Sequence, residues 1–315
     1  MKNMEFASFD LNEFEASRGR QRLDLAAKLD DILMSSGFLL LSGHGVPNGT
    51  IESQWAAVSA FFDLSRDQKA KIAAPYTSYP YGWIGPDKEA LAASMGEITP
   101  PDLKESFNGG PLHVPEDILD PQAFEFCYQP TLWPQLGGFK AAWTAYYHEM
   151  EQLAARLMSA FAEALKLERT FFNKFIDAPI SALRALNYPA TRGEITVKQQ
   201  RAGAHTDYGS LTILLPETGS SGLQIFFNGA WITVPTQKDC FVINIGDLMS
   251  RWTSDRWAST LHRVVALPDQ PSRKSLAFFH QPNWDADIAP LDHSSRYPAV
   301  KSGPYLVEKF KASTS

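Results

Sequence analysis

Cysteine is scarce in this chain. Cys127 and Cys240 are the only two among 315 residues, and they lie far apart in the sequence. Two isolated thiols cannot form a disulfide framework or a cysteine zinc cluster, so the composition favours a reducing compartment. With 44% hydrophobic and 20% charged residues, the chain has the balance of a globular protein with a sizeable core.

An excess of basic charge and long apolar segments are also lacking. Lysine and arginine total 29 against 35 acidic residues, which gives a formal net charge of −6 and argues against nucleic acid as a partner. No apolar run approaches the roughly 18 residues that a membrane-spanning helix needs, and residues 1–10 contain no apolar signal core. We therefore expect a cytoplasmic protein that does not bind membranes. Its seven histidines are the first place to look for chemistry.

The N-terminal third predicts helices around one buried strand. Apolar residues at helical spacing over 23–33, followed by Gly37, predict a helix, and the apolar run 38–41 predicts a strand. A second helix is expected after Pro47, and capping-box spacing at Ser65 predicts a short third one.

The middle of the chain predicts loops followed by a long helix. Residues 74–138 are rich in proline, glycine and aromatic residues, which indicates long loops, with residues 74–110 as a candidate lid. Apolar residues spaced three and four apart predict a core-packing helix over 139–168.

From about residue 181 the pattern changes to short strands separated by turn residues. This favours an antiparallel sandwich or barrel, and Asn228-Gly229 indicates a hairpin. The expected fold class is α+β with a mostly β core. Residues 1–138 would pack on residues 139–315 as one catalytic unit. The expected strands are 183–188, 211–215, 223–227, 231–234, 241–245, 261–266 and 275–279.

Two histidines and one aspartate form a candidate metal site. His205 and Asp207 are two residues apart, so on a strand their side chains would point to the same side. His262 lies in a later predicted strand, which in a barrel can return beside an earlier one. Two histidines and one carboxylate on one face are the ligand set of non-haem Fe(II) oxygenases. The alternative for His262 is a packed, hydrogen-bonded core residue.

Arg273 and Ser275 form a candidate anion-binding pair that leads into the last predicted core strand. An arginine can hold a carboxylate through two parallel hydrogen bonds, and a nearby hydroxyl adds a further donor. The alternative for Arg273 is an ordinary surface arginine.

Together these residues resemble those of the Fe(II)/2-oxoglutarate-dependent dioxygenases, especially the isopenicillin-N-synthase-like branch. The resemblance extends over nearly the whole chain through short motifs that occur in the family's order. These motifs are Gly37-Phe38, His44-Gly45-Val46-Pro47, Lys104-Glu105-Ser106-Phe107, Asn187-Tyr188-Pro189, Gly209-Ser210-Leu211-Thr212, Asn244-Ile245-Gly246-Asp247 and Ser259-Thr260-Leu261-His262-Arg263-Val264.

The resemblance implies a double-stranded β-helix, or jelly-roll, barrel flanked by helices, with a helical N-terminal portion. It also implies an Fe(II) cofactor and 2-oxoglutarate as co-substrate, and no catalytic residue is expected beyond the metal ligands. Arg273 and Ser275 would hold the distal carboxylate of 2-oxoglutarate, assisted by the Tyr188 hydroxyl. The Fe(II) ligands would be His205, Asp207 and His262.

Other residues receive weaker assignments. Phe279, Phe107 and Tyr81 are candidate substrate contacts, with core or loop packing as the alternative for each. Arg184 and Arg201 are expected to be surface or structural residues. Packing or turn roles are expected for His44 and for residues 244–247.

The implied activity is oxidation by dioxygen. 2-Oxoglutarate would be converted to succinate and carbon dioxide, and a ferryl species would hydroxylate, desaturate or cyclise a small organic substrate, with ascorbate as a candidate reductant. The main alternative is an iron oxidase that does not use 2-oxoglutarate, because such relatives keep the Arg-x-Ser pair. A non-catalytic metal-binding jelly-roll protein is a second alternative, and a zinc hydrolase is disfavoured because no general base stands out. A small molecule is the expected partner, and a monomer the expected state.

Overall fold

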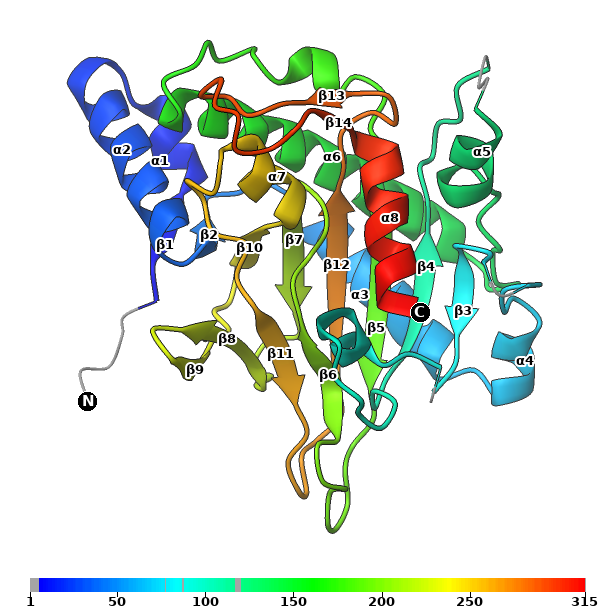
Figure 1. Cartoon of the computed structure of the whole chain (residues 1–315). Coiled ribbons are helices and arrows are strands. Elements are labelled where there is room, and N and C mark those ends of the chain that lie inside the picture. Colours follow the sequence, from blue (N-terminus) through cyan, green and yellow to red (C-terminus); the bar gives the residue numbers. More distant parts are fainter. Residues whose placement is uncertain (1–5, 77, 87, 117–119, 315) are drawn as a thin grey trace.

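Two sheets of unequal size face each other at the centre of the molecule (Figure 1). The computed structural model describes residues 6–76, 78–86, 88–116 and 120–314. Within these ranges the larger sheet has eight strands in the order β1-β2-β10-β7-β12-β5-β4-β3, and the smaller sheet has four in the order β6-β11-β8-β9. The two sheets form the expected jelly-roll core.

Most strands pair with antiparallel neighbours, and only β1 and β2 run parallel within the larger sheet. The larger sheet consists of β1 (Ser8–Asp10), β2 (Phe38–Ser42), β3 (Gly82–Ile84), β4 (Glu105–Gly109), β5 (Ala182–Tyr188), β7 (Leu211–Pro216), β10 (Phe241–Ile245) and β12 (Arg273–His280). The smaller sheet consists of β6 (Gln200–His205), β8 (Leu223–Phe227), β9 (Ala230–Thr233) and β11 (His262–Val265). A separate pair is formed by β13 (Asp287–Ile288) and β14 (Val300–Lys301).

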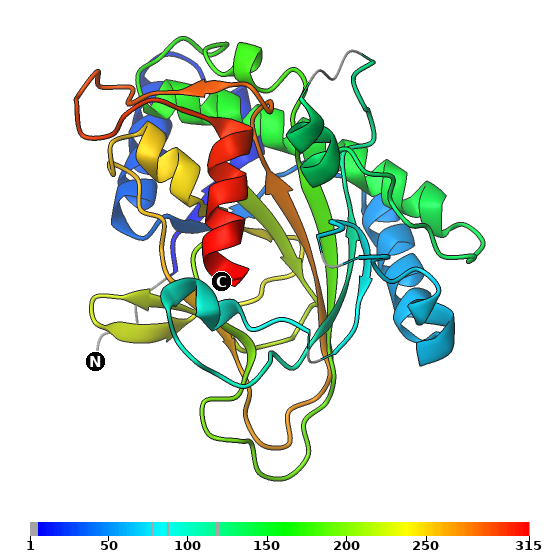
Figure 2. The ribbon, with the colours of Figure 1, turned by 45° about the vertical axis from the view of Figure 1, so that its right-hand side comes forward.

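Helices cover the outer face of the larger sheet, and further short helices lie around the open side of the core (Figures 1 and 2). The helices are α1 (Leu11–Ala16), α2 (Gly19–Ser35), α3 (Asn48–Phe62), α4 (Arg66–Ala70), α5 (Pro121–Cys127), α6 (Phe139–Ala164), α7 (Asp247–Trp252) and α8 (Ser302–Thr314), with 3-10 turns η1 (Leu91–Met95) and η2 (Asn173–Phe175).

The hydrophobic core is divided between the two faces of the larger sheet. On the outer face, α2, α3 and α6 bury their apolar residues against the strands, and Trp143 and Phe161 of α6 are fully buried. The inner face meets the smaller sheet in a second apolar cluster. Side chains such as Leu186 and Ala277 from the larger sheet pack there with Ile225 from the smaller one. This inner cluster surrounds the space in which the polar site described below is built.

The N-terminal predictions are confirmed. The expected helices correspond to α2, α3 and α4, and Ser65 and Gln68 form a capping box at the start of α4. Gly37 has a φ of +64°, and a Cβ atom there would lie 1.8 Å from the carbonyl oxygen of Ala258. Only glycine therefore fits where the chain before β2 meets the segment that leads into β11.

The structure corrects several predicted boundaries. Residues 74–138 include β3, β4, η1 and α5 rather than loops alone. The first strand of the smaller sheet, β6, was not among the predicted strands, because its residues include Gln200, Arg201 and Gly203 rather than an apolar run. Helix α6 ends at Ala164 and not at 168, because Lys166 takes a left-handed conformation with a φ of 59°.

The N-terminal region is also more than a layer packed on the core, since β1 to β4 are strands of the larger sheet. Of the N-terminal segment expected to lack a signal core, residues 1–5 lie outside the described residues.

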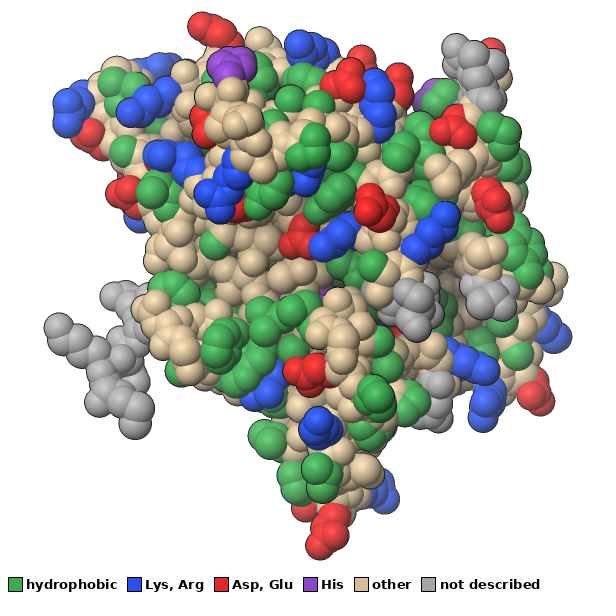
Figure 3. All heavy atoms as spheres, viewed as in Figure 1, with side chains coloured by type: hydrophobic (Ala, Val, Ile, Leu, Met, Phe, Trp, Pro, Cys, Tyr) green, Lys and Arg blue, Asp and Glu red, His purple; other side chains and the backbone are tan. Residues whose placement is uncertain are grey.

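None of the helices in the described ranges is long and apolar enough to cross a membrane. On the face shown in Figure 3, basic and acidic side chains are interspersed.

Phe107→Ala tests the outer part of the core. The Phe107 ring is fully buried and contacts the rings of Phe61, Phe139 and Trp143. Removing it should lower the free energy of unfolding by about 3–5 kcal/mol, because the cavity cannot close. Urea unfolding measures this loss. Phe124→Ala, at a ring that is 46% exposed, is the control, and a loss of similar size in both variants would contradict the packing described.

Candidate metal centre and co-substrate pocket

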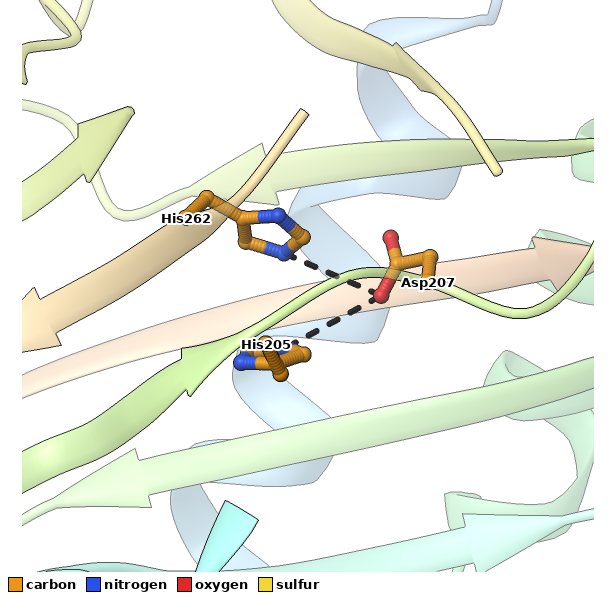
Figure 4. A group of neighbouring side chains, drawn as sticks. All are labelled: His205, Asp207 and His262. Atoms are coloured by element: carbon orange, nitrogen blue, oxygen red, sulfur yellow. Dashed lines mark ion pairs between the residues drawn. The ribbon is translucent and has the colours of Figure 1, made fainter. Parts of the chain in front are cut away.

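His205, Asp207 and His262 converge from two neighbouring segments (Figure 4). His205 is the last residue of β6, His262 is the first residue of β11, and the two lie directly opposite each other in the antiparallel pair. Their ring centroids are 4.3 Å apart. His262 also pairs with Ile225 of β8, an inner-core residue, so the rings face the space between the sheets.

Asp207 reaches the histidines in a different way from the one predicted. Strand β6 ends at His205, so Thr206 and Asp207 belong to the turn before β7. The carboxylate is therefore placed by this turn and by its own hydrogen bonds, and not by strand alternation.

Hydrogen bonds from the Nδ1 atoms of the two histidines leave their Nε2 atoms facing the carboxylate of Asp207. The Nδ1 atoms of His205 and His262 lie 2.7 and 3.0 Å from the carbonyl oxygens of Gly203 and Thr260. These contacts place the ring protons on Nδ1 and leave the Nε2 lone pairs available. The two Nε2 atoms lie 3.9 Å (His205) and 3.7 Å (His262) from Oδ1 of Asp207.

The second oxygen of Asp207 is held by two donors. Thr212 Oγ1 and Asn244 Nδ2 donate to Oδ2 at 2.5 and 2.7 Å. Burial would raise the pKa of Asp207, but the two histidines and these hydrogen bonds outweigh it and lower the pKa. Burial and the neighbouring His262 ring lower the pKa of His205. Near pH 7 the site thus holds an ionised carboxylate beside a neutral His205 imidazole.

This donor set fits a divalent iron. The candidate ligand atoms all lie within 4.8 Å of one another, and two imidazoles with one carboxylate form the facial set that leaves coordination positions open in non-haem Fe(II) oxygenases. No thiol belongs to the group, which disfavours a structural cysteine zinc site.

The segment Asn244-Ile245-Gly246-Asp247 does more than form a turn. Besides the Asn244 bond to Asp207, the Asp247 backbone N–H donates to the Asp207 carbonyl at 2.7 Å. The Asp247 carboxylate accepts from Thr206 Oγ1 at 3.2 Å and from Ser259 Oγ at 2.5 Å. The sequence interpretation missed this role because polar residues beside a glycine also suit an ordinary turn. The signal was available in the order Asn-x-x-Asp, which begins inside the apolar strand at Asn244 and ends just after it.

Arg273, Ser275 and Tyr188 lie together on the inner face of the larger sheet. Arg273 pairs with Tyr188 across β12 and β5, and its guanidinium carbon lies 5.0 Å from the tyrosine ring centroid. All three side chains are buried, at 3% exposure or less. Burial lowers the pKa of Arg273, opposed by Tyr188 and Glu217, and an arginine still remains protonated at neutral pH.

The Arg273 guanidinium is only partly satisfied. Its Nε and Nη1 atoms are buried and have no hydrogen-bond partner in the part of the chain that the structure describes. Because an unpaired buried cation is costly, such donors fit an anionic ligand, and a carboxylate matches the fork of a guanidinium. A small dicarboxylate therefore suits this end of the inner space.

The three predicted substrate contacts have different environments. Phe279 lies two residues after Ala277 on β12 and packs at the margin of the inner cluster. Phe107 faces the opposite side of the sheet, in the core formed with α6, so the prediction of a substrate contact for it is wrong. Strand alternation is the cause, because Phe107 pairs with the outward-facing Ala185. The Tyr81 hydroxyl donates to the carbonyl of Cys127 at 2.6 Å, which favours loop packing for this buried side chain.

The other assigned residues are mostly structural, as predicted. Arg201 is buried and donates to the carbonyls of Pro189 and Pro271. The Val46 N–H donates to Nδ1 of the buried His44. Arg184 is not a surface residue of the kind expected. It pairs with Ala277 of the inner cluster, so it lies on the inner face of the larger sheet, and its guanidinium belongs to a charged cluster.

This charged cluster consists of Glu89, Asp102, Lys104 and Arg184. Glu89 lies 3.2 Å from Arg184 and 3.3 Å from Lys104, and Lys104 also pairs with Asp102 at 2.7 Å. Asp102 accepts from the N–H of Gly203 at 2.9 Å, two residues before His205. The cluster thus ties the candidate lid to strand β6, and its two cations and two anions balance in charge.

Comparisons with known proteins agree with this geometry. Residues 180–282 match the 2OG-Fe(II) oxygenase superfamily, and residues 8–136 match the N-terminal family of non-haem dioxygenases in morphine synthesis. The validamycin A dioxygenase of Streptomyces hygroscopicus subsp. limoneus is 32% identical over 95% of this chain and 84% of the relative. The proline hydroxylase buaE of Petromyces alliaceus is 31% identical over 91% of each protein.

A solved structure shows the same similarity in three dimensions. The crystal structure of a full-length Neurospora crassa protein in complex with alpha-KG and thymine superposes with a TM-score of 0.86. It is 28% identical, and the match covers 99% of this chain and 98% of that one.

The chain belongs to the 2OG-Fe(II) oxygenase superfamily. Its relatives are 2-oxoglutarate-dependent dioxygenases, so it is an Fe(II)/2-oxoglutarate-dependent dioxygenase, and the alternative of an oxidase that does not use 2-oxoglutarate is not supported.

Asn244→Ala tests how Asp207 is held. Loss of the amide removes one of two donors to Oδ2, so the carboxylate can rotate away from the two Nε2 atoms. The dissociation constant for Mn(II), a redox-inert probe, should rise roughly 10-fold, the lower end of the range for residues that support metal ligands. Electron paramagnetic resonance of free Mn(II) gives the constant. Asn283→Ala removes an amide that bonds to Ala178 and should leave binding unchanged; equal effects would refute the assignment.

Glu89→Gln tests the charged cluster through its pH dependence. Burial would raise the pKa of Glu89, but Arg184 and Lys104 outweigh it and hold the pKa at about 2, below the ordinary 4.5. A lowered pKa stabilises the fold above about pH 4.5, and this contribution disappears as the pH falls towards 2. The free energy of unfolding of the wild type should therefore exceed that of the Glu89→Gln variant by on the order of 2–3 kcal/mol at pH 7. This difference should shrink between pH 5 and pH 2.

Urea unfolding across this pH range measures the difference, with Glu168→Gln at an exposed position as the control. A gap between the wild type and Glu89→Gln that does not change with pH would contradict the ion pairing.

Proposed function

We propose that this enzyme couples the decarboxylation of 2-oxoglutarate to the hydroxylation of a small organic molecule. His205, Asp207 and His262 bind the Fe(II), and Arg273, with Ser275 and Tyr188, holds the distal carboxylate of 2-oxoglutarate. One observation carries this proposal: three converging ligand atoms line the space between the two sheets, together with a buried guanidinium whose Nε and Nη1 atoms have no partner among the described residues.

When bound, the iron, 2-oxoglutarate and dioxygen supply the oxidising chemistry, which yields succinate, carbon dioxide and an oxidised substrate. The protein provides position and shielding. Thr212 and Asn244 fix the Asp207 carboxylate, and the carbonyls of Gly203 and Thr260 fix the orientation of the imidazole rings. Arg273 would hold the dicarboxylate through its Nε and Nη1 donors, which have no other partner among the described residues.

The inner apolar cluster excludes water from this space. Leu186, Ala277 and then Phe279 follow Arg273 in order along the inner face of strands β5 and β12. We place the substrate beside Phe279, at the end of this row away from Arg273. Thymine is bound in the solved structure of one relative, and another relative is named for validamycin A, which supports a small organic molecule as the substrate.

Hydroxylation is favoured over desaturation or cyclisation by the proline hydroxylase among the relatives. A screen of small polar molecules for succinate formation that depends on the added compound, with Fe(II) and ascorbate present, identifies the substrate. Mass spectrometry of the product then distinguishes a gain of one oxygen atom from a loss of two hydrogens. Products that have lost two hydrogens without gaining oxygen would overturn hydroxylation.

Arg273→Gln tests the co-substrate site. Loss of the charged fork should raise the dissociation constant of 2-oxoglutarate for the Mn(II)-loaded protein by about 10- to 100-fold, while Mn(II) binding itself stays near that of the wild type. Isothermal titration calorimetry measures both constants. Arg273→Lys keeps the positive charge but lacks the two parallel donors of the guanidinium. Its dissociation constant for 2-oxoglutarate should lie between those of the wild type and Arg273→Gln.

Arg296→Gln changes an arginine whose side chain is 58% exposed and is the control for loss of charge. If Arg273→Gln and Arg296→Gln bind 2-oxoglutarate equally well, Arg273 does not hold the co-substrate.

A further inference from the structure

The carboxylate of Asp247 joins the two segments that carry the metal-ligand candidates. Oδ2 accepts from Thr206, which lies between His205 and Asp207, and Oδ1 accepts from Ser259, three residues before His262. Its side chain is only 15% exposed. The partly buried carboxylate of Asp247 therefore connects the segment of His205 and Asp207 with the segment that leads to His262.

The third contact of this carboxylate comes from the far end of the sequence. Lys309 of α8 places its Nζ atom 2.6 Å from Asp247 Oδ2. The same ammonium lies 5.3 Å from the centroid of the Tyr208 ring, and Tyr208 directly follows Asp207. The neighbouring Phe310 ring packs edge-on against Tyr208, at a centroid distance of 5.2 Å. The C-terminal part of α8 thus contacts the turn that carries Asp207 through both charge and ring packing.

Helix α8 is held at both of its ends. At its start, Gly303 donates to the Trp284 carbonyl at 2.8 Å, and a Cβ atom on Gly303 would lie 2.2 Å from the Trp284 ring. At its far end α8 contacts η1, which itself packs against β6 (Figures 1 and 2). The helix therefore crosses the open side of the core between α7 and the candidate lid.

We propose that Lys309 is a positioning residue for the metal ligands. By pairing with Asp247 it fixes the carboxylate that holds Thr206 and Ser259, and so makes the geometry of the ligand-bearing turn depend on the docking of α8. The inference rests on the proposed function in so far as the triad binds a metal. It assigns to the C-terminal helix a role in holding the turn that carries Asp207.

The physical basis is the demand of a partly buried carboxylate for donors. Without Lys309, two hydroxyl groups would have to satisfy the Asp247 charge alone, and the turn containing Thr206 would lose a fixed point. A surface ion pair would contribute little, but the Asp247 side chain is only 15% exposed and bonds to both ligand-bearing segments.

Lys309→Met is the test variant, and Lys309→Arg should rescue it. Lys301→Met is the matched control, since Lys301 pairs with the exposed Asp287 at 2.9 Å and lies just before α8. We expect the dissociation constant for Mn(II) to rise about three- to tenfold in Lys309→Met, somewhat less than for residues that bond directly to a ligand. Lys309→Arg and Lys301→Met should match the wild type.

Hydrogen exchange of the metal-free proteins gives a second readout. In Lys309→Met, exchange should increase in residues 206–209 and 258–261 as well as in α8. Asp247→Asn should produce the same increase near the ligands, and adding Lys309→Met to it should weaken Mn(II) binding no further.

Faster exchange confined to α8, with unchanged Mn(II) affinity, would show that Lys309 only anchors the helix and would overturn the proposal. A wild-type protein that binds no Mn(II) would instead overturn the proposed metal site, and the exchange of residues 206–209 would still decide the role of Lys309.

Discussion

The site depends on the register between β6 and β11. His205 and His262 face each other because they are direct cross-strand partners at the ends of these two strands. A slip by one residue would turn one of the imidazoles to the other side of the sheet, since side chains alternate along a strand. The apolar residues of β11, such as Val264 on the inner side, penalise such a slip because it would expose them. The same hydrophobic burial that stabilises the barrel therefore also sets the distance between the two rings.

The charged side chains near the site differ in whether the protein itself satisfies their hydrogen-bonding groups. Asp207 is surrounded by donors, and Asp102 and Lys104 neutralise each other next to β6. Arg273 is the contrast, since two of its nitrogen atoms lack partners among the residues that the structure covers. A buried cation in this condition destabilises the protein when it is alone. If Arg273 holds the co-substrate as proposed, a bound dicarboxylate would remove this cost and so would also stabilise the core.

The sequence was sufficient for the parts of the site that depend on residue type and order. The triad, the arginine and most strands of the C-terminal half carry distinctive chemistry or apolar runs. It was insufficient where tertiary context decides. Strand β6 contains Arg201 and Gly203 and has no apolar run, yet it pairs with β11 through its backbone. Phe107 required the register of β4 to be known before its face could be assigned. Asp247 looks like a turn residue until Ser259 and Lys309 are brought to it from other parts of the chain.

The pairing of β2 with β10 has a consequence for biosynthesis. Strand β2 consists of the apolar residues Phe38–Leu41 and Ser42, and its antiparallel partner begins only at Phe241. At a synthesis rate of about 5–20 residues per second, on the order of 10 to 40 seconds pass before that partner leaves the ribosome. During this interval the nascent chain carries an apolar strand with a free edge, of the kind that promotes aggregation. The short parallel strand β1, made before β2 and paired with it, can cover one edge of β2, while the other edge stays unpaired until β10 has been synthesised.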